Sequence, residues 1–306
     1  MRGFILIAGF VLTIQCGYTQ ETVLRINTID SIEIEGNLIH AGYSKLVLFI
    51  AGSGPTDRNC NNSMGLQTDA FKLLADTLSS NGISSFRYDK RGIGLSTPVS
   101  EANLTIQDYI FDASFLVDHF SNEYDEVYLF GHSEGALIGK VVTQENRNVD
   151  GFLSVCGTSV PLDDIIREQL AKFPKLLDLA EVHLQEIEND EPLSEVNPML
   201  MSLFRESVVP YLKSVFALDP IEEIKKINTK TLIVGGSCDR QVSTEHSNAL
   251  HEANPSTSLL NIESMGHVLK SLESDCSNDL NSYSDPTMSL HPELVHALFN
   301  FIGDQD

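Results

Sequence analysis

Short apolar runs and amphipathic segments alternate along most of this chain. The apolar runs are rich in β-branched and large residues and lack polar spacers, as expected of strands buried on both faces of a sheet. They lie at 45–51, 83–88, 127–130, 152–156, 231–235 and 258–262. Apolar residues at spacings of three and four positions predict helices between these runs. The helices are expected at about 67–81, 105–122, 243–253 and 292–302.

This regular alternation determines the expected architecture. Consecutive strands joined by helices run parallel, with right-handed crossovers as the default. Before the first central strand, residues 23–29 and 31–40 indicate two short strands around a turn. The sequence therefore predicts an α/β protein, with a mainly parallel central sheet that is flanked by helices and preceded by a hairpin.

One long segment interrupts the alternation. Residues 161–227 show no strand pattern, only helical spacing of Leu, Ile and Phe. Prolines, which break helices, interrupt the segment at Pro174, Pro192, Pro198, Pro210 and Pro220. Placed between two strands at their carboxyl ends, the segment is expected to form a helical lid over a ligand site. We therefore predict a core formed by residues 20–160 and 228–306, with a helical insertion at 161–227.

The N-terminus has the three-part pattern of a secretory signal peptide. Arg2 supplies an early positive charge, residues 4–14 are apolar, and a short polar stretch follows. The apolar run is too short to cross a bilayer. Cys16 raises the alternative of a lipoprotein, but the two residues before it are larger than those expected before a lipidated cysteine. We therefore predict a signal peptide at residues 1–19 and an exported protein, periplasmic or extracellular.

Composition restricts the partners. The chain has 43 acidic and 20 basic residues and a formal charge of -23, which argues against nucleic acid or an anionic membrane surface as a partner. No second apolar run approaches membrane length, so no stable membrane insertion of the mature chain is expected. Four cysteines follow the signal segment, and their wide spacing matches neither a zinc site nor a disulfide-dense small fold. Whether any of them pair is left open: Cys60, Cys156, Cys238 and Cys276.

The candidate chemistry centres on residues 127–139. Four large apolar residues lead directly into Gly-His-Ser-Glu-Gly and then into a helix-permissive segment. This order predicts a strand, a tight turn and a helix, with Gly131 and Gly135 leaving room where strand and helix crowd together. Such a turn strains Ser133 and exposes its hydroxyl beside the first N–H groups of the helix. Because the five-residue pattern also occurs by chance, the flanking strand and helix carry the prediction of Ser133 as the nucleophile.

A serine nucleophile needs a base that takes its proton and a third group that orients the base. Among nine histidines, His267 follows the last predicted strand on a loop that can overhang the carboxyl edge of the sheet. His132 adjoins the nucleophile, but its side chain is expected to point away from Ser133. Asp239 follows the strand at 231–235 on a flexible loop. The predicted set is therefore a serine, an aspartate and a histidine, in that chain order.

The oxyanion formed in acyl transfer needs two N–H donors. The backbone N–H of Glu134, directly after the nucleophile, is expected to supply one, while the Glu134 side chain faces away. The loop at 52–59, Gly-Ser-Gly-Pro-Thr-Asp-Arg-Asn, follows a central strand and can approach a ligand closely. We expect the second donor to come from Ser53 or Gly54.

Four charged residues near these loops receive no catalytic assignment. Asp89 and Arg91 lie in a glycine-rich turn after a strand, and we expect them to fix that loop. Asp57 and Arg58 follow the oxyanion loop, where a structural role is favoured over contact with substrate or lid.

Four motifs together resemble the bacterial α/β-hydrolase serine esterases, most closely the esterase D type. They are Gly-His-Ser-Glu-Gly (131–135), the loop at 52–59, Arg-Tyr-Asp-Lys-Arg-Gly-Ile-Gly-Leu-Ser (87–96) and Gly-His-Val-Leu-Lys (266–270). The chain order of the three predicted catalytic residues is also that of α/β-hydrolases. The resemblance implies an α/β-hydrolase fold with a helical lid, and hydrolysis of small-molecule carboxylic esters through an acyl-enzyme. It implies no metal and no organic cofactor.

Two other functions are open at the level of the sequence. A serine peptidase of the aminopeptidase kind has the same fold, and the Asp and Glu residues of 163–223 could bind the free amine of its substrate. A non-catalytic binding protein is disfavoured by the intact Ser133, Asp239 and His267. The acyl chain length, the alcohol, the physiological substrate and the oligomeric state do not follow from the sequence.

Overall fold

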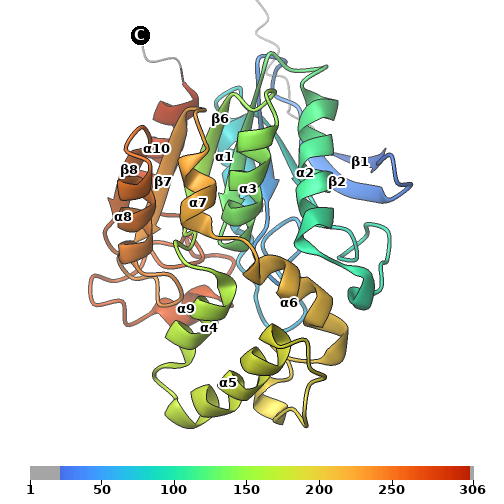
Figure 1. Ribbon diagram of the computed structural model, residues 1–306. Coiled ribbons are helices and arrows are strands. Elements are labelled where there is room, and N and C mark those ends of the chain that lie inside the picture. The colour runs from blue at the N-terminus through green and yellow to red at the C-terminus, as the bar shows by residue number, and fades with distance from the viewer. Residues whose placement is uncertain (1–20, 304–306) are drawn as a thin grey trace, which may run out of the picture.

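The computed structural model describes residues 21–303 (Figure 1). The predicted signal peptide and Cys16 lie outside these residues. The described chain forms an eight-stranded sheet in the order β1-β2-β4-β3-β5-β6-β7-β8. Strand β2 is antiparallel to both of its neighbours, and all other neighbouring strands are parallel. The predicted α/β architecture and the N-terminal hairpin are confirmed.

The elements of the core follow the predicted order. The strands are β1 (Glu21–Asn27), β2 (Glu33–Ile39), β3 (Lys45–Ile50), β4 (Ser84–Tyr88), β5 (Glu126–His132), β6 (Gly151–Val155), β7 (Thr231–Gly236) and β8 (Ser258–Ile262). The helices are α1 (Ala70–Ser79), α2 (Ile106–Phe120), α3 (Glu134–Glu145), α8 (Thr244–Ala253), α9 (Asp279–Ser282) and α10 (Pro292–Ile302). Among these α-helices only the short α9 was not expected, and a 3-10 turn at Glu101–Asn103 precedes α2. The ends of the expected elements differ from the predicted ones by a few residues.

The sheet is buried on both faces, which explains the continuous apolar runs of its central strands. In β3, Leu46 and Leu48 belong to the apolar cluster under α2 and α3. Val47 and Phe49, which point the other way, belong to the cluster under α1 and α10. Figure 1 shows α2, α3 and α7 (Pro220–Lys225) side by side over one face of the sheet.

The segment predicted as an insertion is helical and contains no strand. It forms α4 (Leu162–Leu170), α5 (Pro174–Glu188), α6 (Val209–Phe216) and α7, with two 3-10 turns at 198–200 and 206–208. Four of its prolines lie at the first or second position of α5, α6, α7 and the first 3-10 turn, where a missing N–H costs no hydrogen bond. The prolines therefore divide the segment into short helices, as predicted.

Helices α4, α5 and α6 form a small unit with its own apolar core (Figure 1). Ile166, Leu184, Phe204 and Leu212 are buried there. By contrast, α7 packs against α3 and α8 and so extends the helical layer of the main core. The chain boundary of the unit, predicted as 161–227, stays a prediction.

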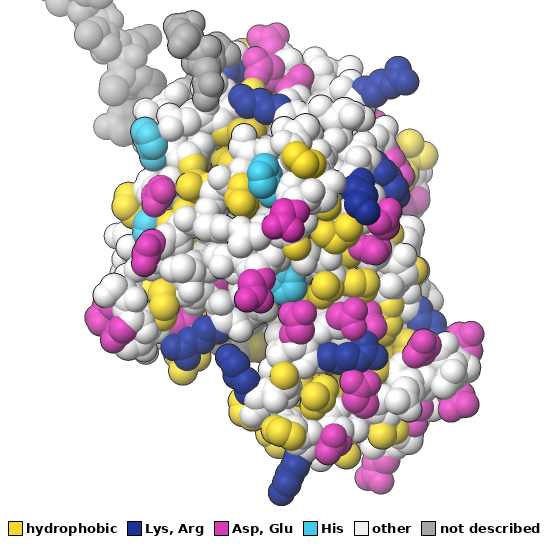
Figure 2. All heavy atoms as spheres, turned by 60° about the vertical axis from the view of Figure 1, so that its left-hand side comes forward, with side chains coloured by type: hydrophobic (Ala, Val, Ile, Leu, Met, Phe, Trp, Pro, Cys, Tyr) yellow, Lys and Arg dark blue, Asp and Glu magenta, His cyan; other side chains and the backbone are white. Residues whose placement is uncertain are grey.

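The unit is joined to the core near the start of α2. Arg205 forms an ion pair with Glu101, and the N–H of Ile106 donates to the Ser214 hydroxyl at 2.9 Å. Figure 2 shows acidic side chains spread over the face that it draws, with Lys and Arg side chains between them. No helix within residues 21–303 is both long and apolar enough to cross a bilayer.

Candidate active site

Ser133 lies at a sharp turn between β5 and α3. Its backbone angles, φ 56° and ψ -119°, are far from those of ordinary L-residues, so the turn must be held by its surroundings. Two glycines permit that packing. A Cβ on Gly135 would overlap the Ile50 carbonyl group, with its carbon only 2.8 Å away, and a Cβ on Gly131 would lie 2.8 Å from the Cα of Ala136. The turn has the form predicted for a nucleophile.

Asp239 and His267 meet at the carboxyl edge of the sheet. Asp239 follows β7 and His267 follows β8, and both are buried. The Nδ1 of His267 donates a hydrogen bond to Asp239 Oδ2 at 2.7 Å. The other carboxylate oxygen accepts from the N–H groups of Gln241 and Val242 at 2.8 and 2.9 Å. This arrangement fixes the ring and leaves its Nε2 as the acceptor.

The same contacts keep Asp239 ionised. Burial alone raises the pKa of a carboxyl group. At Asp239 the contacts with His267 and with two backbone N–H groups outweigh burial, and the pKa lies below its ordinary value. The carboxylate is therefore negative at neutral pH and can stabilise a positive charge on the histidine ring.

A cavity of about 400 Å³ opens at Ser133 and His267. Within the described residues, its walls come from the loop after β3, the segment at 60–66 and the loops after β7 and β8, with Tyr283. The wall residues are Gly52, Ser53, Thr56, Cys60, Asn62, Met64, Gly65, Leu66, His132, Gln241, Val268 and Tyr283. Neither a carboxylate side chain nor any residue of 161–227 is among them. The three residues predicted for catalysis thus lie at one edge of the sheet, two of them on one cavity.

The predicted oxyanion loop lies against the nucleophile. A Cβ added to Gly52 would be 3.2 Å from the Ser133 Cβ, so the loop passes the serine closely. Ser53 lines the cavity, whereas Gly54, with φ 69°, is outside its walls. Glu134 begins α3, so its N–H belongs to the helix turn that has no internal acceptor. The Glu134 side chain faces away from the cavity, as expected, and is buried beside Lys90 at 3.6 Å.

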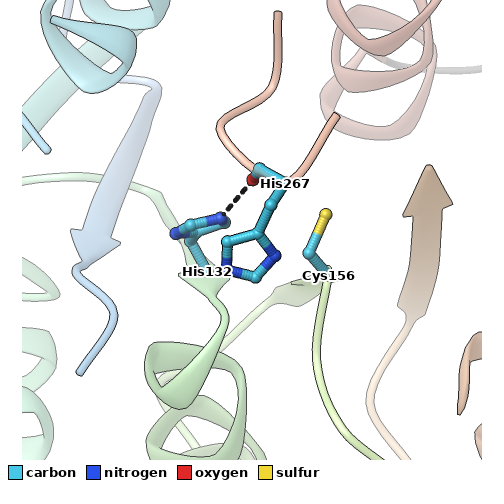
Figure 3. A group of neighbouring side chains, drawn as sticks. All are labelled: His132, Cys156 and His267. Atoms are coloured by element: carbon cyan, nitrogen blue, oxygen red, sulfur yellow. Dashed lines mark hydrogen bonds between the residues drawn. The ribbon is translucent and has the colours of Figure 1, made fainter. Parts of the chain in front are cut away.

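Two further side chains surround His267, the predicted base. In Figure 3 the His267 ring lies between the side chains of His132 and Cys156. The Nε2 of His132 donates to the His267 carbonyl oxygen at 2.8 Å and so holds that loop. Burial, together with the nearby His267, lowers the pKa of His132 to about 3, and burial raises the pKa of the Cys156 thiol. Both groups are neutral, and our reading of the sequence assigned neither of them to the site.

These three side chains bring potential metal ligands together. Their ligand atoms lie within 4.8 Å of one another. However, His267 Nδ1 is bound to Asp239, and His132 Nε2 is bound to a backbone carbonyl. One ring nitrogen of each histidine is therefore already engaged in a hydrogen bond, and at His267 that bond is the contact between the predicted acid and base.

The charged residues near the loops have structural contacts. The Asp89 carboxylate accepts from the backbone N–H and the guanidinium of Arg58, at 2.8 and 2.6 Å. Arg91 pairs with Asp112 on α2, and not with Asp89. Asp57 accepts from two N–H groups of its own turn. The loop-fixing role expected of Asp89 and Arg91 is present, and Arg58, for which a structural role was favoured, is part of the same support.

Comparison with known proteins gives one family match. Residues 63–194 match the family described as "Serine aminopeptidase, S33". Among curated proteins, no sequence matches this chain.

Solved structures with the same fold include several esterases. An esterase of Pyrococcus furiosus superposes with a TM-score of 0.62 at 16% identity, over 92% of this chain and 90% of that chain. An esterase of Exiguobacterium antarcticum gives 0.58 at 16% identity, over 91% and 98%. Est1E of Butyrivibrio proteoclasticus, solved with ferulic acid bound, gives 0.58 at 15% identity, over 91% and 98%. At these identities the likeness establishes the fold alone.

Proposed function

We propose that this chain, which has the α/β-hydrolase fold, is an exported serine esterase that cleaves carboxylic esters through an acyl-enzyme. The observation that carries the proposal is the combination of a strained Ser133 with the 2.7 Å contact between His267 and Asp239, with Ser133 and His267 on one cavity. The esterases among the structural neighbours support the same reaction class.

In the proposed mechanism, His267 Nε2 takes the proton of the Ser133 hydroxyl as Oγ attacks the carbonyl carbon of the ester. The negative oxygen of the tetrahedral intermediate accepts hydrogen bonds from the backbone N–H of Glu134 and from the 52–54 loop. The C–O bond to the alcohol then breaks, and the alcohol leaves with the proton that His267 held. A water molecule repeats these steps on the acyl-enzyme and releases the acid.

An aminopeptidase is the second candidate, since the matched family is described as one. Recognition of a free α-amine calls for a nearby carboxylate, because a cation is costly to bury unpaired. The walls of the cavity, within the described residues, contain no carboxylate side chain and instead offer hydroxyl and amide groups, as at Thr56, Asn62 and Gln241. A lining without carboxylates favours a neutral ester over an amino-terminal peptide.

Export is supported by the disulfide between Cys238 and Cys276, in addition to the N-terminal pattern. Disulfides persist in oxidising compartments and are rare in the reducing cytosol. Cys60 and Cys156, which are buried, remain free thiols.

The experiment is a substrate panel combined with active-site labelling. The chain without residues 1–19 is assayed with p-nitrophenyl esters of increasing acyl length and with aminoacyl p-nitroanilides. A fluorophosphonate is then mapped by mass spectrometry. We expect ester turnover, phosphonylation at Ser133, and loss of about 10⁶-fold in turnover for Ser133→Ala, as in comparable triads. Preferred cleavage of the anilides would replace the esterase by the peptidase, and undiminished turnover by Ser133→Ala would remove the nucleophile.

A further inference from the structure

A buried lysine lies directly behind the oxyanion loop. Lys90 follows β4, and only 1% of its side chain is exposed. Its Nζ donates to the carbonyl oxygen of Gly52 at 2.6 Å. It also lies 3.6 Å from a carboxylate oxygen of Glu134 and 4.9 Å from the centre of the Tyr109 ring. Burying an ammonium group is costly unless it is paired. Two of its partners, the Gly52 carbonyl and the Glu134 carboxylate, belong to residues next to Ser133 in space or in sequence.

The Gly52–Ser53 peptide unit lies between Lys90 and the cavity, since its carbonyl accepts from Lys90 and its two residues line the cavity. The described residues contain no cis peptide bond, and in a planar trans unit the C=O and the N–H point in opposite directions. Lys90 holds the Gly52 carbonyl toward the protein interior. The N–H of Ser53 is therefore directed to the opposite side, where Gly52 and Ser53 line the cavity with Ser133. A cation at the carbonyl oxygen also polarises the peptide and strengthens its N–H as a donor.

We propose that Lys90 is a positioning residue for the oxyanion hole: it orients and polarises the Gly52–Ser53 peptide so that the Ser53 N–H, and not that of Gly54, is the second donor. This inference rests on the proposed acyl transfer at Ser133. Glu134 then has two separate roles. Its backbone N–H is the first donor, and its buried carboxylate is the counter-charge that holds Lys90 under the loop.

The chain offers a matched control for a buried lysine. Lys140 on α3 is fully buried and, like Lys90, donates to a backbone carbonyl, that of Thr158 at 3.1 Å. It is not part of the cavity wall and does not contact the 52–54 loop. Removal of Lys140 therefore reports what loss of a buried lysine does to the protein in general.

The test compares Lys90→Met/Glu134→Gln with Lys140→Met. The double change removes both charges together, because Glu134 left alone would be an unpaired buried carboxylate. Three quantities are measured: kcat and KM on the best ester, the affinity for a trifluoromethyl ketone that adds to the serine as a tetrahedral adduct, and the rate of phosphonylation. If this double variant does not fold, Lys90→Gln/Glu134→Gln replaces it, since the glutamine side chain is one bond shorter and loses the contact with Gly52.

For the double variant we expect kcat to fall about 10- to 100-fold with little change in KM, somewhat less than loss of a whole donor. Ketone affinity should fall by the same factor as kcat/KM, since both report binding of the tetrahedral state. Lys140→Met should match the wild type. A folded double variant within twofold of the wild type overturns the proposal, as does a loss of kcat with unchanged ketone affinity. If the wild type cleaves no ester but is phosphonylated faster than the double variant, the proposed esterase function is refuted, while the role of Lys90 stands.

Discussion

The disulfide between Cys238 and Cys276 should contribute much of the stability of the loop that carries the catalytic acid. Cys238 directly precedes Asp239, and Cys276 lies in the segment between β8 and α10, before α9. The perturbation is Cys238→Ser/Cys276→Ser, or reduction of the wild type. Either change removes the covalent link between the acid loop and that segment, and it leaves the hydrogen bonds that Asp239 makes to Gln241, Val242 and His267.

The size of the effect follows from the length of the closed loop. The two cysteines are 38 positions apart. In the chain-entropy treatment, opening a loop of that size lowers the free energy of unfolding by about 4 kcal/mol. A described chain of this length has an unfolding entropy of roughly 0.6 kcal/mol per degree near its midpoint, so Tm should fall by about 7 °C. We expect kcat/KM to fall less than tenfold, because the contacts that orient the acid remain.

The assay is thermal unfolding of the wild type and the double serine variant, each with and without a reductant, with free thiols counted in every sample. The reductant should lower Tm of the wild type to that of the variant and leave the variant itself unchanged. Cys60 and Cys156 are free in both proteins and act as the internal control for thiol effects. Equal Tm values for oxidised and fully reduced wild type would refute the reasoning.

Two further predictions concern the helix after the nucleophile. In Gly135→Ala the new Cβ meets backbone atoms that cannot rotate away, 2.8 Å from the Ile50 carbonyl carbon at the end of β3 and 2.9 Å from the carbonyl oxygen of Ala51 just after it. We expect the free energy of unfolding in urea to fall by about 1–3 kcal/mol and kcat to fall as well. A variant of wild-type stability contradicts the packing. Burial lowers the pKa of Lys140 to about 7. Below pH 7 the folded protein therefore bears the full free-energy cost of burying a charged lysine. Between pH 7 and about 10.4 the lysine has lost its proton in the folded protein but keeps it in the unfolded chain. The stability of the wild type relative to Lys140→Met should therefore rise over that window, and a constant difference in urea unfolding at pH 7, 8.5 and 10 contradicts it.

Most of the fold was predictable because each element carries its own local pattern. The uninterrupted apolar runs require a sheet covered on both faces, and their order along the chain requires parallel pairing. The positions of Ser133, Asp239 and His267 follow from the same logic. Each lies in the connection that follows a strand, and the carboxyl ends of parallel strands share one edge. A fold-level pattern was therefore enough to place the three residues together.

The supporting residues were not predictable in the same way. Lys90 belongs to a polar, glycine-rich turn, where a lysine is ordinarily solvated. Only the pairing of β4 with β3 brings it under Gly52. Cys156 also follows a central strand, and that position could have identified it. The partner of Cys238 could not have been found, because cysteine spacing does not determine pairing.

The residues that line the cavity differ from those expected to cover the site. The helical insertion was expected to form a lid over the ligand site, and this stays a prediction. Within the described residues, the cavity walls include the segment at 60–66, Gln241 and Tyr283, and they contain no residue of the insertion. These walls support each other, since the N–H of Gln67 donates to the Tyr283 carbonyl and the Gln241 amide donates to the Tyr283 hydroxyl, at 2.8 and 2.9 Å. Residues 60–66 can be exchanged in a protein that keeps its own insertion. A change of acyl preference in that variant would show that this wall selects the acyl group.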